Sequence, residues 1–425
     1  MKTIKFISFS LTIFLISCTA RYAQDEISCL QIVDRNGLTE TIGTEDKLNK
    51  FKNVNFDQPQ SYQKVLRIYQ KNLRGEVISK LTSYHDNGLL WKSLGIRNAR
   101  AYGNYKEWYS NGNIRIEATV IGGSPDFNLQ DDWLFDGVCK CYDEKGFLLT
   151  EFNYQKGFLH GESKYYHENS NLKKLIPYIK NEIHGEVAEY SENGGCISKS
   201  NYKNGIKDGP TIGFWSENNI SFLEDYENDL LINGQYFEKT KVKISQIKNG
   251  DGLKTVFNNN KISKIVEYKN GRPQGKIQVF SESGVLLNEY FQKNNIKDGM
   301  EIVYYTENEI GKFQGKKAIP KFQIGWDNGN INGVVKTWYK NGNLESQKQY
   351  FQNKKNGAHY AWYENGSVMF IEDYENDIIS KGSYFQIDQK DPTSTIINGN
   401  GIASIFDSSG RFIKKISYKE GLPSQ

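Results

Sequence analysis

Proline, cysteine and histidine are scarce in this chain of 425 residues, which has eight prolines, five cysteines and five histidines. We find no Gly-x-Ser-x-Gly motif, no phosphate-binding loop and no cysteine or histidine set with the spacing of a metal site. The acidic pairs Glu224-Asp225 and Glu372-Asp373 recur with a sequence repeat, which favours turn or edge-strand roles over acid–base chemistry. The sequence therefore predicts no catalytic residue, no cofactor and no metal ligand.

Neither sign of charge predominates in the sequence. The 54 basic and 50 acidic residues leave a formal net charge of +4, and no basic block is long enough to mark a nucleic-acid footprint. We expect no nucleic-acid partner.

Long apolar runs are absent except at the N-terminus, where Lys2 and Lys5 precede the apolar stretch 6–16. That stretch is too short to span a bilayer and fits a secretory signal. It ends in Leu15-Ile16-Ser17-Cys18, which resembles the lipobox of bacterial lipoproteins. The resemblance implies that residues 1–17 are a signal peptide and that Cys18 is lipidated, with 18–29 as a tether. Ordinary cleavage after Ala20 or Ala23 is the alternative.

Four cysteines remain after such processing: Cys29, Cys139, Cys141 and Cys196. Cys139 and Cys141 are two residues apart on an expected strand, so their side chains share a face and are badly placed to form a disulfide with each other. We interpret the four as free thiols, although an exported protein could oxidise them.

The feature that is abundant is a repeat of about 24 residues. Its leading glycines include Gly137, Gly161, Gly185 and Gly209, each followed five residues later by an aromatic residue and seventeen residues later by a tyrosine. The rule also holds from Gly103, Gly252, Gly275, Gly299, Gly333, Gly357 and Gly401 for the aromatic at position five. A fixed period of this length indicates an array of units that rest on their neighbours.

The repeats divide the chain. Residues 30–75 are expected to hold a hairpin at 30–41 and a segment, 44–62, that caps the first edge of the sheet. Residues 76–425 are the array, with an insertion at 121–132 that we expect to form a loop on one edge. Blocks near 185–275 and 333–423 are related by a shift of 148 residues, which indicates an internal duplication.

Each unit reads as two strands joined by a turn such as Asn341-Gly342. Asn-Gly is favoured in tight hairpin turns because both residues tolerate positive φ. The predicted fold is all-β, with tandem β-hairpins forming an elongated, twisted, largely antiparallel sheet.

Further aromatic residues stand at position six, or once at position four, on the opposite face from position five. They are Tyr109, Tyr165, Trp215, Tyr305, Tyr339 and Tyr363. Two interpretations remain open: cross-strand packing that stiffens a thin sheet, or an exposed ladder of rings for a protein or glycan.

The pattern Gly-x4-aromatic, Asn-Gly-x-Leu and Tyr-x-Asn-Gly resembles the MORN-repeat variant of bacterial proteins, often labelled YwqK-type antitoxin repeats. Residues that carry the resemblance include Gly161, Tyr166, Asn169, Leu172 and Tyr178. It covers roughly residues 76–425 and implies tandem β-hairpins without catalytic residues.

The functional prediction is a non-enzymatic scaffold in the bacterial envelope, anchored in a membrane through Cys18 and binding an envelope protein. The side of the membrane and the oligomeric state stay open. One alternative is an antitoxin or immunity protein that neutralises a toxin by surface binding, which would be expected in the cytoplasm. Another is a glycan-binding module.

Overall fold

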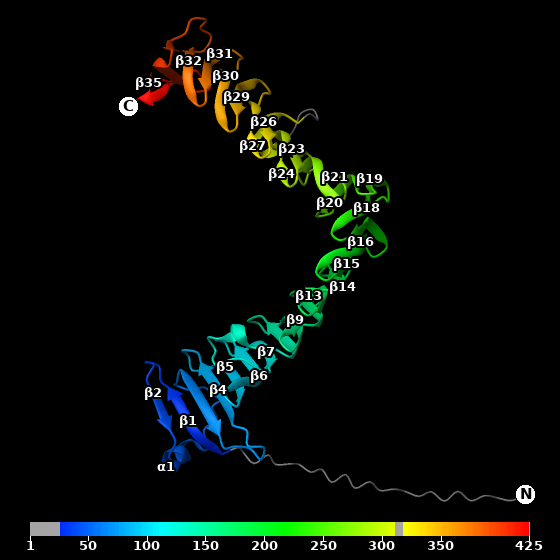
Figure 1. Ribbon diagram of the computed structural model, residues 1–425, viewed down its shortest axis with the longest axis vertical. Coiled ribbons are helices and arrows are strands. Elements are labelled where there is room, and N and C mark those ends of the chain that lie inside the picture. Colours follow the sequence, from blue (N-terminus) through cyan, green and yellow to red (C-terminus); the bar gives the residue numbers. More distant parts are fainter. Residues whose placement is uncertain (1–25, 311–317, 425) are drawn as a thin grey trace, which may run out of the picture. The chain divides into compact units, whose positions relative to one another are not determined.

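The computed structural model describes residues 26–310 and 318–424 (Figure 1). The signal peptide 1–17, Cys18 and most of the tether lie outside the described residues. Within the described ranges the chain forms 36 strands, the short helices α1 (Glu45–Leu48) and α2 (Glu307–Ile310), and the 3-10 turns η1 (Asn49–Phe51) and η2 (Gln130–Asp132). All the strands belong to one sheet with antiparallel pairing, so the predicted all-β class with tandem hairpins is confirmed.

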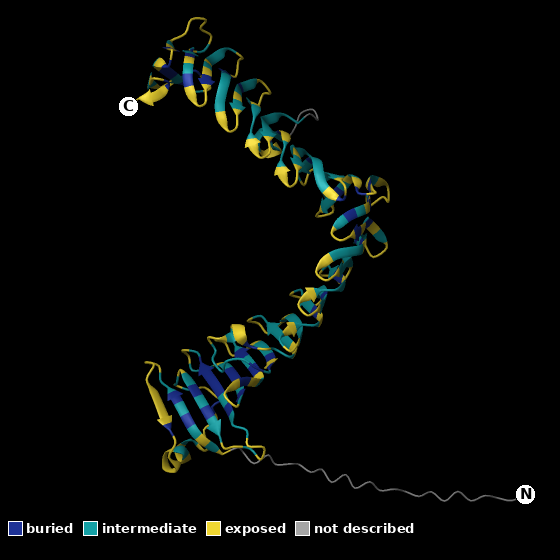
Figure 2. Cartoon of the chain, viewed as in Figure 1, coloured by how far each residue is buried: buried dark blue, intermediate teal, exposed yellow. Residues whose placement is uncertain are grey.

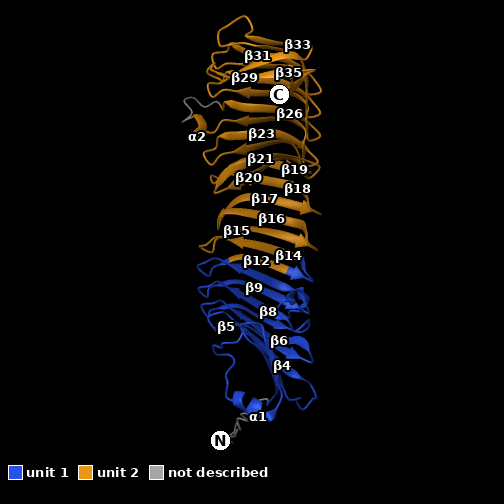
Figure 3. Ribbon diagram, turned by 90° about the vertical axis from the view of Figure 1, so that its left-hand side faces the viewer, with its two compact units in different colours: residues 1–172, 178–182 blue, residues 173–177, 183–425 orange. Residues whose placement is uncertain are grey.

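Contacts divide the chain into two compact units, one extending to Leu172 and including Tyr178–Glu182, the other comprising Lys173–Pro177 and the chain from Ile183 (Figure 3). The strands of the first unit are β1 (Ile27–Val33), β2 (Thr39–Ile42), β3 (Lys64–Tyr69), β4 (Ile78–Tyr84), β5 (Leu90–Arg97), β6 (Arg100–Trp108), β7 (Ile114–Val120), β8 (Gly137–Tyr142), β9 (Leu148–Gln155), β10 (Phe158–Leu159) and β11 (Gly161–Tyr166). The strands β12 (Leu172–Ile179) and β13 (Glu182–Ile183) contain residues at the change of unit.

The second unit continues in the same manner. Its strands are β14 (Gly185–Tyr190), β15 (Cys196–Lys203), β16 (Ile206–Ser216), β17 (Asn219–Glu227), β18 (Leu230–Phe237), β19 (Lys243–Lys248), β20 (Asp251–Asn258), β21 (Lys261–Lys269), β22 (Arg272–Phe280), β23 (Leu286–Lys293), β24 (Ile296–Lys297), β25 (Gly299–Tyr304), β26 (Pro320–Asp327), β27 (Asn330–Ile331), β28 (Gly333–Trp338), β29 (Leu344–Phe351), β30 (Lys354–Trp362), β31 (Val368–Glu375), β32 (Ile378–Tyr384), β33 (Ser394–Ile397), β34 (Asn400–Phe406), β35 (Phe412–Lys419) and β36 (Leu422–Ser424).

Some Asn-Gly pairs match the expectation and others do not: both residues have positive φ at Asn204-Gly205 and Asn328-Gly329, for example. At Asn341-Gly342 only the glycine has positive φ, +89°. The Gly342 amide donates to the Tyr339 carbonyl and the Tyr339 amide donates to the Asn343 carbonyl, both at 2.9 Å, and the strand register shifts beside the turn. This is a three-residue loop with a type I turn and a glycine bulge, so the prediction that both residues adopt positive φ is wrong here.

A turn with two positive φ values lies at the opposite end of this hairpin, between β29 and β30. Gln352 and Asn353 have φ of +46° and +67°, as a type I′ turn requires. The Asn353 amide donates to the Ile331 carbonyl at 2.9 Å, and the Asn353 Oδ1 atom accepts from the Ile331 amide at 2.7 Å. This turn is thereby bonded to the preceding hairpin.

The segment 44–62 covers a face of the sheet rather than its edge. Phe56 is 1% exposed and packs with Leu30, Val65 and Tyr84. The edge strand is β2, which pairs only with β1 among the described strands. The prediction of an edge cap is therefore wrong: burial of Phe56 drives the segment onto the sheet face, where Figure 2 shows many buried positions.

The insertion 121–132 also folds onto a face instead of standing out at an edge. Phe127 and the following Trp133 pack into a cluster with Leu94 and Tyr105, and the rings of Trp133 and Tyr105 meet edge to face at 4.9 Å. The Trp133 indole donates to the Ser124 carbonyl at 2.7 Å. Aromatic burial explains why the extra residues turn inward.

Candidate functional site

The proposed ladder of exposed aromatic rings is not exposed. Tyr305, Tyr339 and Tyr363 are 9%, 7% and 0% exposed. Their hydroxyls donate to the backbone carbonyls of Trp338, Trp362 and Phe385 at 2.6, 2.8 and 2.7 Å. The exposed interpretation is wrong for these rings, because a buried phenol needs an acceptor and finds it on a following hairpin.

The other members of the set are half-buried. Tyr109 donates to the Tyr142 carbonyl at 2.9 Å, and the Trp215 indole donates to the Phe237 carbonyl at 3.1 Å. Tyr165 packs edge-on against Phe152, with ring centroids 5.7 Å apart. These residues join hairpins within the array rather than forming a free binding face.

Sequence reasoning missed one residue of this group. His85 occupies position six of an early, degenerate unit, and its Nε2 atom lies 2.9 Å from the Trp108 carbonyl oxygen. A sequence signal for His85 existed. It lies at position six of its unit, where a ring with a polar nitrogen or hydroxyl can bond to the next hairpin.

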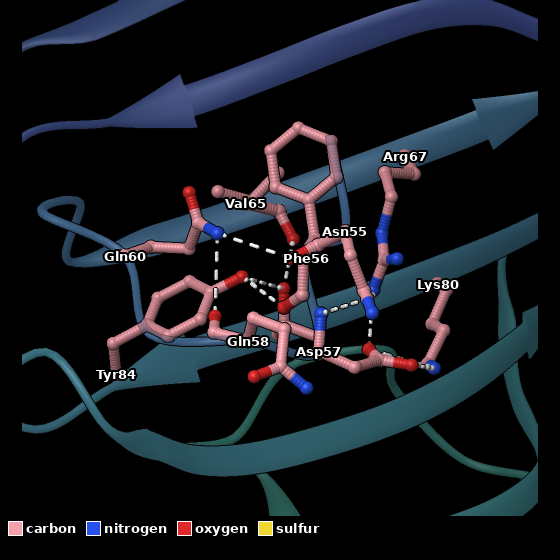
Figure 4. Close-up of polar contacts among 10 residues, drawn as sticks. Asn55, Phe56, Asp57, Gln58, Gln60, Val65, Arg67, Lys80 and Tyr84 are labelled. Carbon is pink, nitrogen blue, oxygen red and sulfur yellow. Dashed lines mark hydrogen bonds and ion pairs between the residues drawn. The ribbon is translucent and has the colours of Figure 1, made fainter. Parts of the chain in front are cut away.

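A hollow in the first unit lies between residues 57–59 and strands β4 to β6, with a volume of about 740 Å³. One wall is held by Asp57, whose carboxylate accepts two bonds from Lys80, at 3.0 and 2.8 Å, and lies 3.5 Å from Arg67 (Figure 4). Burial alone would raise the pKa of Asp57, but the hydrogen bond and charge of Lys80, with the charge of Arg67, lower it below its ordinary value. The Asp57 carboxylate is thus ionised, and Lys80 and Arg67 hold it in place.

The same wall is tied to the sheet by a second contact. The Tyr84 hydroxyl donates to the Phe56 carbonyl at 2.6 Å, beside the buried Phe56 ring (Figure 4). Burial raises the pKa of Tyr84 to about 12, so the phenol keeps its proton at neutral pH. The groove is a preformed feature of the fold.

The floor of the groove combines aromatic and polar groups from β5 and β6, including Tyr102, Asn104, Lys106 and Trp108. The Lys106 ammonium is paired with Glu117 at 2.7 Å. A Cβ atom at Gly95 would lie 2.5 Å from the Tyr102 carbonyl, so close approach of the two backbones requires glycine there. With its lysines already paired, the groove suits a ligand that offers apolar surface and neutral hydrogen-bonding groups.

A buried carboxylate lies in the second unit. Glu224 is 5% exposed and accepts bonds from the hydroxyls of Tyr226 and Tyr236 at 2.9 and 2.8 Å, while the Lys254 ammonium lies 2.6 Å away. Burial and the neighbouring Glu224 charge raise the pKa of both tyrosines. Glu224 stands inside β17, where it pairs with Thr211 and Gly234, so the predicted turn or edge-strand role is wrong.

The second block repeats part of this arrangement around Glu372, which is half-buried where Glu224 is buried. The Tyr384 hydroxyl donates to Glu372 at 2.8 Å, but Ile402 stands at the position of Lys254. Because the phenol contact persists without the lysine, we interpret both carboxylates as parts of the strand packing.

The cysteines Cys29, Cys139, Cys141 and Cys196 are free. A hydrogen bond from Cys139 lowers the pKa of Cys141 to about 6, and the same bond raises the pKa of Cys139.

Among the described residues, no three or more histidine, cysteine, aspartate or glutamate side chains gather closely enough to hold a metal ion together. In the same ranges we find no helix with the length and apolar character needed to cross a membrane.

The repeated turns and inter-hairpin bonds define a tandem β-hairpin repeat protein. Four segments match the family model described as the MORN repeat variant: residues 101–121, 159–180, 183–204 and 331–353. No curated protein matches the sequence. At these four places the array is similar to MORN-variant repeats.

Comparison with solved structures gives distant likenesses. The crystal structure of TcdB2-TccC3-TEV is 10% identical, with a TM-score of 0.15, and the match covers 84% of this chain and 24% of that chain. The Tc holotoxin pore of Photorhabdus luminescens is 8% identical, with a TM-score of 0.13, and the match covers 91% and 26% of the two chains. A porin-like protein from Bacteroides uniformis is 7% identical, with a TM-score of 0.15, covering 62% and 96%.

This chain spans about a quarter of the length of the first two of these solved chains. At such scores the likenesses carry no argument about function.

Proposed function

We propose that the protein is an exported lipoprotein, anchored through Cys18, whose hairpin array acts as a scaffold and binds an envelope protein in the groove of its first unit. The observation that supports the binding site is the preformed groove between the wall at Asp57 and the floor at Tyr102 and Trp108. Tyrosine and tryptophan are enriched at protein interfaces, where a ring supplies apolar area together with a polar group.

The chemistry of the groove favours a polypeptide segment as ligand. Its ammonium groups are held by Asp57 and Glu117, so a strongly anionic ligand would have to displace these pairs. Asn104 and the aromatic rings leave hydrogen-bonding and apolar surface for a neutral or mixed segment.

The anchor would place the groove near the membrane. Cys18 precedes Glu26, the first described residue, by eight residues, so covalent geometry limits their separation to about 28 Å. Together, a lipid at Cys18 and a groove in the first unit describe a receptor for a partner close to the bilayer.

Fractionation with acyl labelling of wild type and Cys18→Ala tests the anchor. We expect labelled wild-type protein in the membrane, and an unlabelled, unprocessed mutant. Unlabelled, full-length wild-type protein in the cytoplasm would overturn the anchor and favour the antitoxin alternative. The glycan alternative depended on exposed rings, which the six ladder positions do not provide.

Site-specific photo-crosslinking in cells tests the groove. A photoreactive residue at Tyr102, which is 36% exposed on the groove floor, is compared with one at Leu422, which is 56% exposed at the far end of the chain. We expect one envelope protein to be captured from position 102, and its capture to weaken when Asp57→Ala releases the wall. Equal capture from both positions, or none from position 102, would contradict the groove as the binding site.

A further inference from the structure

Two cysteines lie on one face of strand β8 in the first unit. Cys139 pairs across the sheet with Phe152, and Cys141 pairs with Thr150 on one side and Ile116 on the other. Because alternate residues of a strand point to the same face, the two thiols project together. Two steps along a strand separate their Cα atoms by about 7 Å, so rotation of the two side chains can bring both sulfur atoms to one metal ion, and no disulfide links them.

The surroundings of the pair are mainly apolar. Cys139 packs against the cluster that contains Ala118 and Trp133, and both cysteines are half-buried. Arg115 provides a nearby positive charge, and its guanidinium lies 2.8 Å from the Glu107 carboxylate. The position is thus shielded from bulk water on one side and faces an existing ion pair.

We propose that Cys139 and Cys141 form a two-thiolate site for a soft monovalent metal ion, with Cu(I) as the ion. Thiolate sulfur favours Cu(I), and this ion is satisfied by two thiolates in a nearly linear arrangement. Structural zinc requires four ligands, and the described residues bring no third cysteine, histidine or carboxylate to the pair.

The binding step conserves charge and involves no electron transfer. Each S–H bond that is still intact breaks, its proton passes to water, and two Cu–S bonds form: one cation, one thiolate and one thiol give an anionic bis-thiolate complex and one released proton. Arg115 lies near the pair, but Glu107 already compensates its charge. The apolar shell of Ala118, Trp133 and Phe152 limits the access of water to the bound ion.

The site is tested with Cu(I) itself, on the purified mature chain under anaerobic conditions, by competition with a coloured Cu(I) chelator. We expect one Cu(I) per chain, and X-ray absorption showing two sulfur neighbours. Cys139→Ser and Cys141→Ser should each weaken binding by about 100-fold or more, because a serine hydroxyl is a poor ligand for a soft ion. Cys29→Ser and Cys196→Ser are the matched controls and should bind like wild type.

Far-ultraviolet circular dichroism of each metal-free variant shows whether the variant is folded. We expect these spectra to match wild type, so that weaker Cu(I) binding reports the loss of a sulfur ligand. Cu(I) binding by Cys139→Ser or Cys141→Ser as strong as that of wild type, or absorption spectra without two sulfur neighbours, would overturn the proposal. So would wild-type binding no stronger than that of the variant lacking both cysteines. The outcome is independent of the anchor and of the groove, since the ion contacts neither.

Discussion

The phenol of Tyr339 donates a hydrogen bond of 2.8 Å to the backbone carbonyl of Trp362, one hairpin further along the chain. Tyr339 follows the last residue of β28, and Trp362 ends β30. The bond spans the strand between them and therefore fixes the spacing of two consecutive hairpins at their bulged turns. The same relationship recurs at Tyr305 and Tyr363.

We predict that Tyr363→Phe lowers the local free energy of unfolding by about 1 kcal/mol, because it leaves the carbonyl of the half-buried Phe385 without its phenol donor. Hydrogen exchange of the amides in β30 and β32 measures this local effect. Tyr165→Phe is the control, since none of the hydrogen bonds described above involves the Tyr165 hydroxyl. Equal protection in wild type and Tyr363→Phe would argue against a stabilising role for the bond.

The type I′ turns predict an unusual order of substitutions at Asn353. We expect Asn353→Ala to be less stable than Asn353→Gly by about 1 kcal/mol, because alanine is strained at a φ of +67° whereas glycine is not. Urea unfolding followed by tryptophan fluorescence gives the comparison.

Asn341, in the bulged turn, is the control for that order. Its φ is not positive, so Asn341→Ala should be no less stable than Asn341→Gly. The same order at positions 341 and 353 would contradict our assignment of the two turn types.

The two carboxylate clusters predict different costs for the same mutation. Glu224→Gln leaves the Lys254 ammonium, only 20% exposed, without its counter-ion, and should destabilise the fold by about 3 kcal/mol. Glu372→Gln leaves no such lysine, because Ile402 occupies that position, and should cost about 1 kcal/mol. Chemical denaturation of both variants, with Lys254→Met as a control that removes the orphaned charge, tests the difference. Equal costs would show that Lys254 is not coupled to Glu224.

Alkaline pH should destabilise the array through its buried phenols. Burial raises the pKa of Tyr339 and of Tyr363 to about 12, whereas an unfolded tyrosine titrates near 10. Their contribution is therefore complete below pH 10 and is lost as the pH rises from about 10 towards 12, where the unfolded chain releases protons that the folded chain retains. Urea midpoints across this range, with absorbance at 295 nm for ionisation, measure the loss.

The double variant Tyr339→Phe/Tyr363→Phe is the comparison for this titration. It should lose less stability between pH 10 and 12 than wild type does, because two of the titrating groups are gone. An unchanged pH dependence would mean that other tyrosines account for the alkaline transition.

The hairpin repeat could be predicted from sequence because its signals are local. A glycine, an aromatic residue five positions later and an Asn-Gly pair each constrain a few residues of backbone, as at Gly333, Trp338 and Asn341-Gly342. The turn types could not be assigned, because Asn-Gly fits both a type I′ turn and a bulged loop. The choice depends on the register of the flanking strands.

The sequence also did not predict which face of the sheet each neighbouring segment would cover. Period-two alternation places Tyr363 opposite Trp362 but cannot say which side a neighbouring hairpin will cover. The segment around Phe56 and the insertion with Phe127 pack onto the sheet through contacts distant in sequence. The groove at Asp57 depends on that packing and therefore had no sequence signature.

The bonds between consecutive type I′ turns have a consequence for how such a protein can evolve. The backbone bond from Asn353 to Ile331 has counterparts from Asp377 to Lys355 and from Asp229 to Lys207, so the junction between neighbours is nearly the same throughout. Copying a whole number of hairpins then creates no unfamiliar interface, so the block near 185–275 could have been copied to 333–423 in one genetic event. We expect natural variants of this protein to differ in length by complete hairpins, while the first unit and its groove stay unchanged.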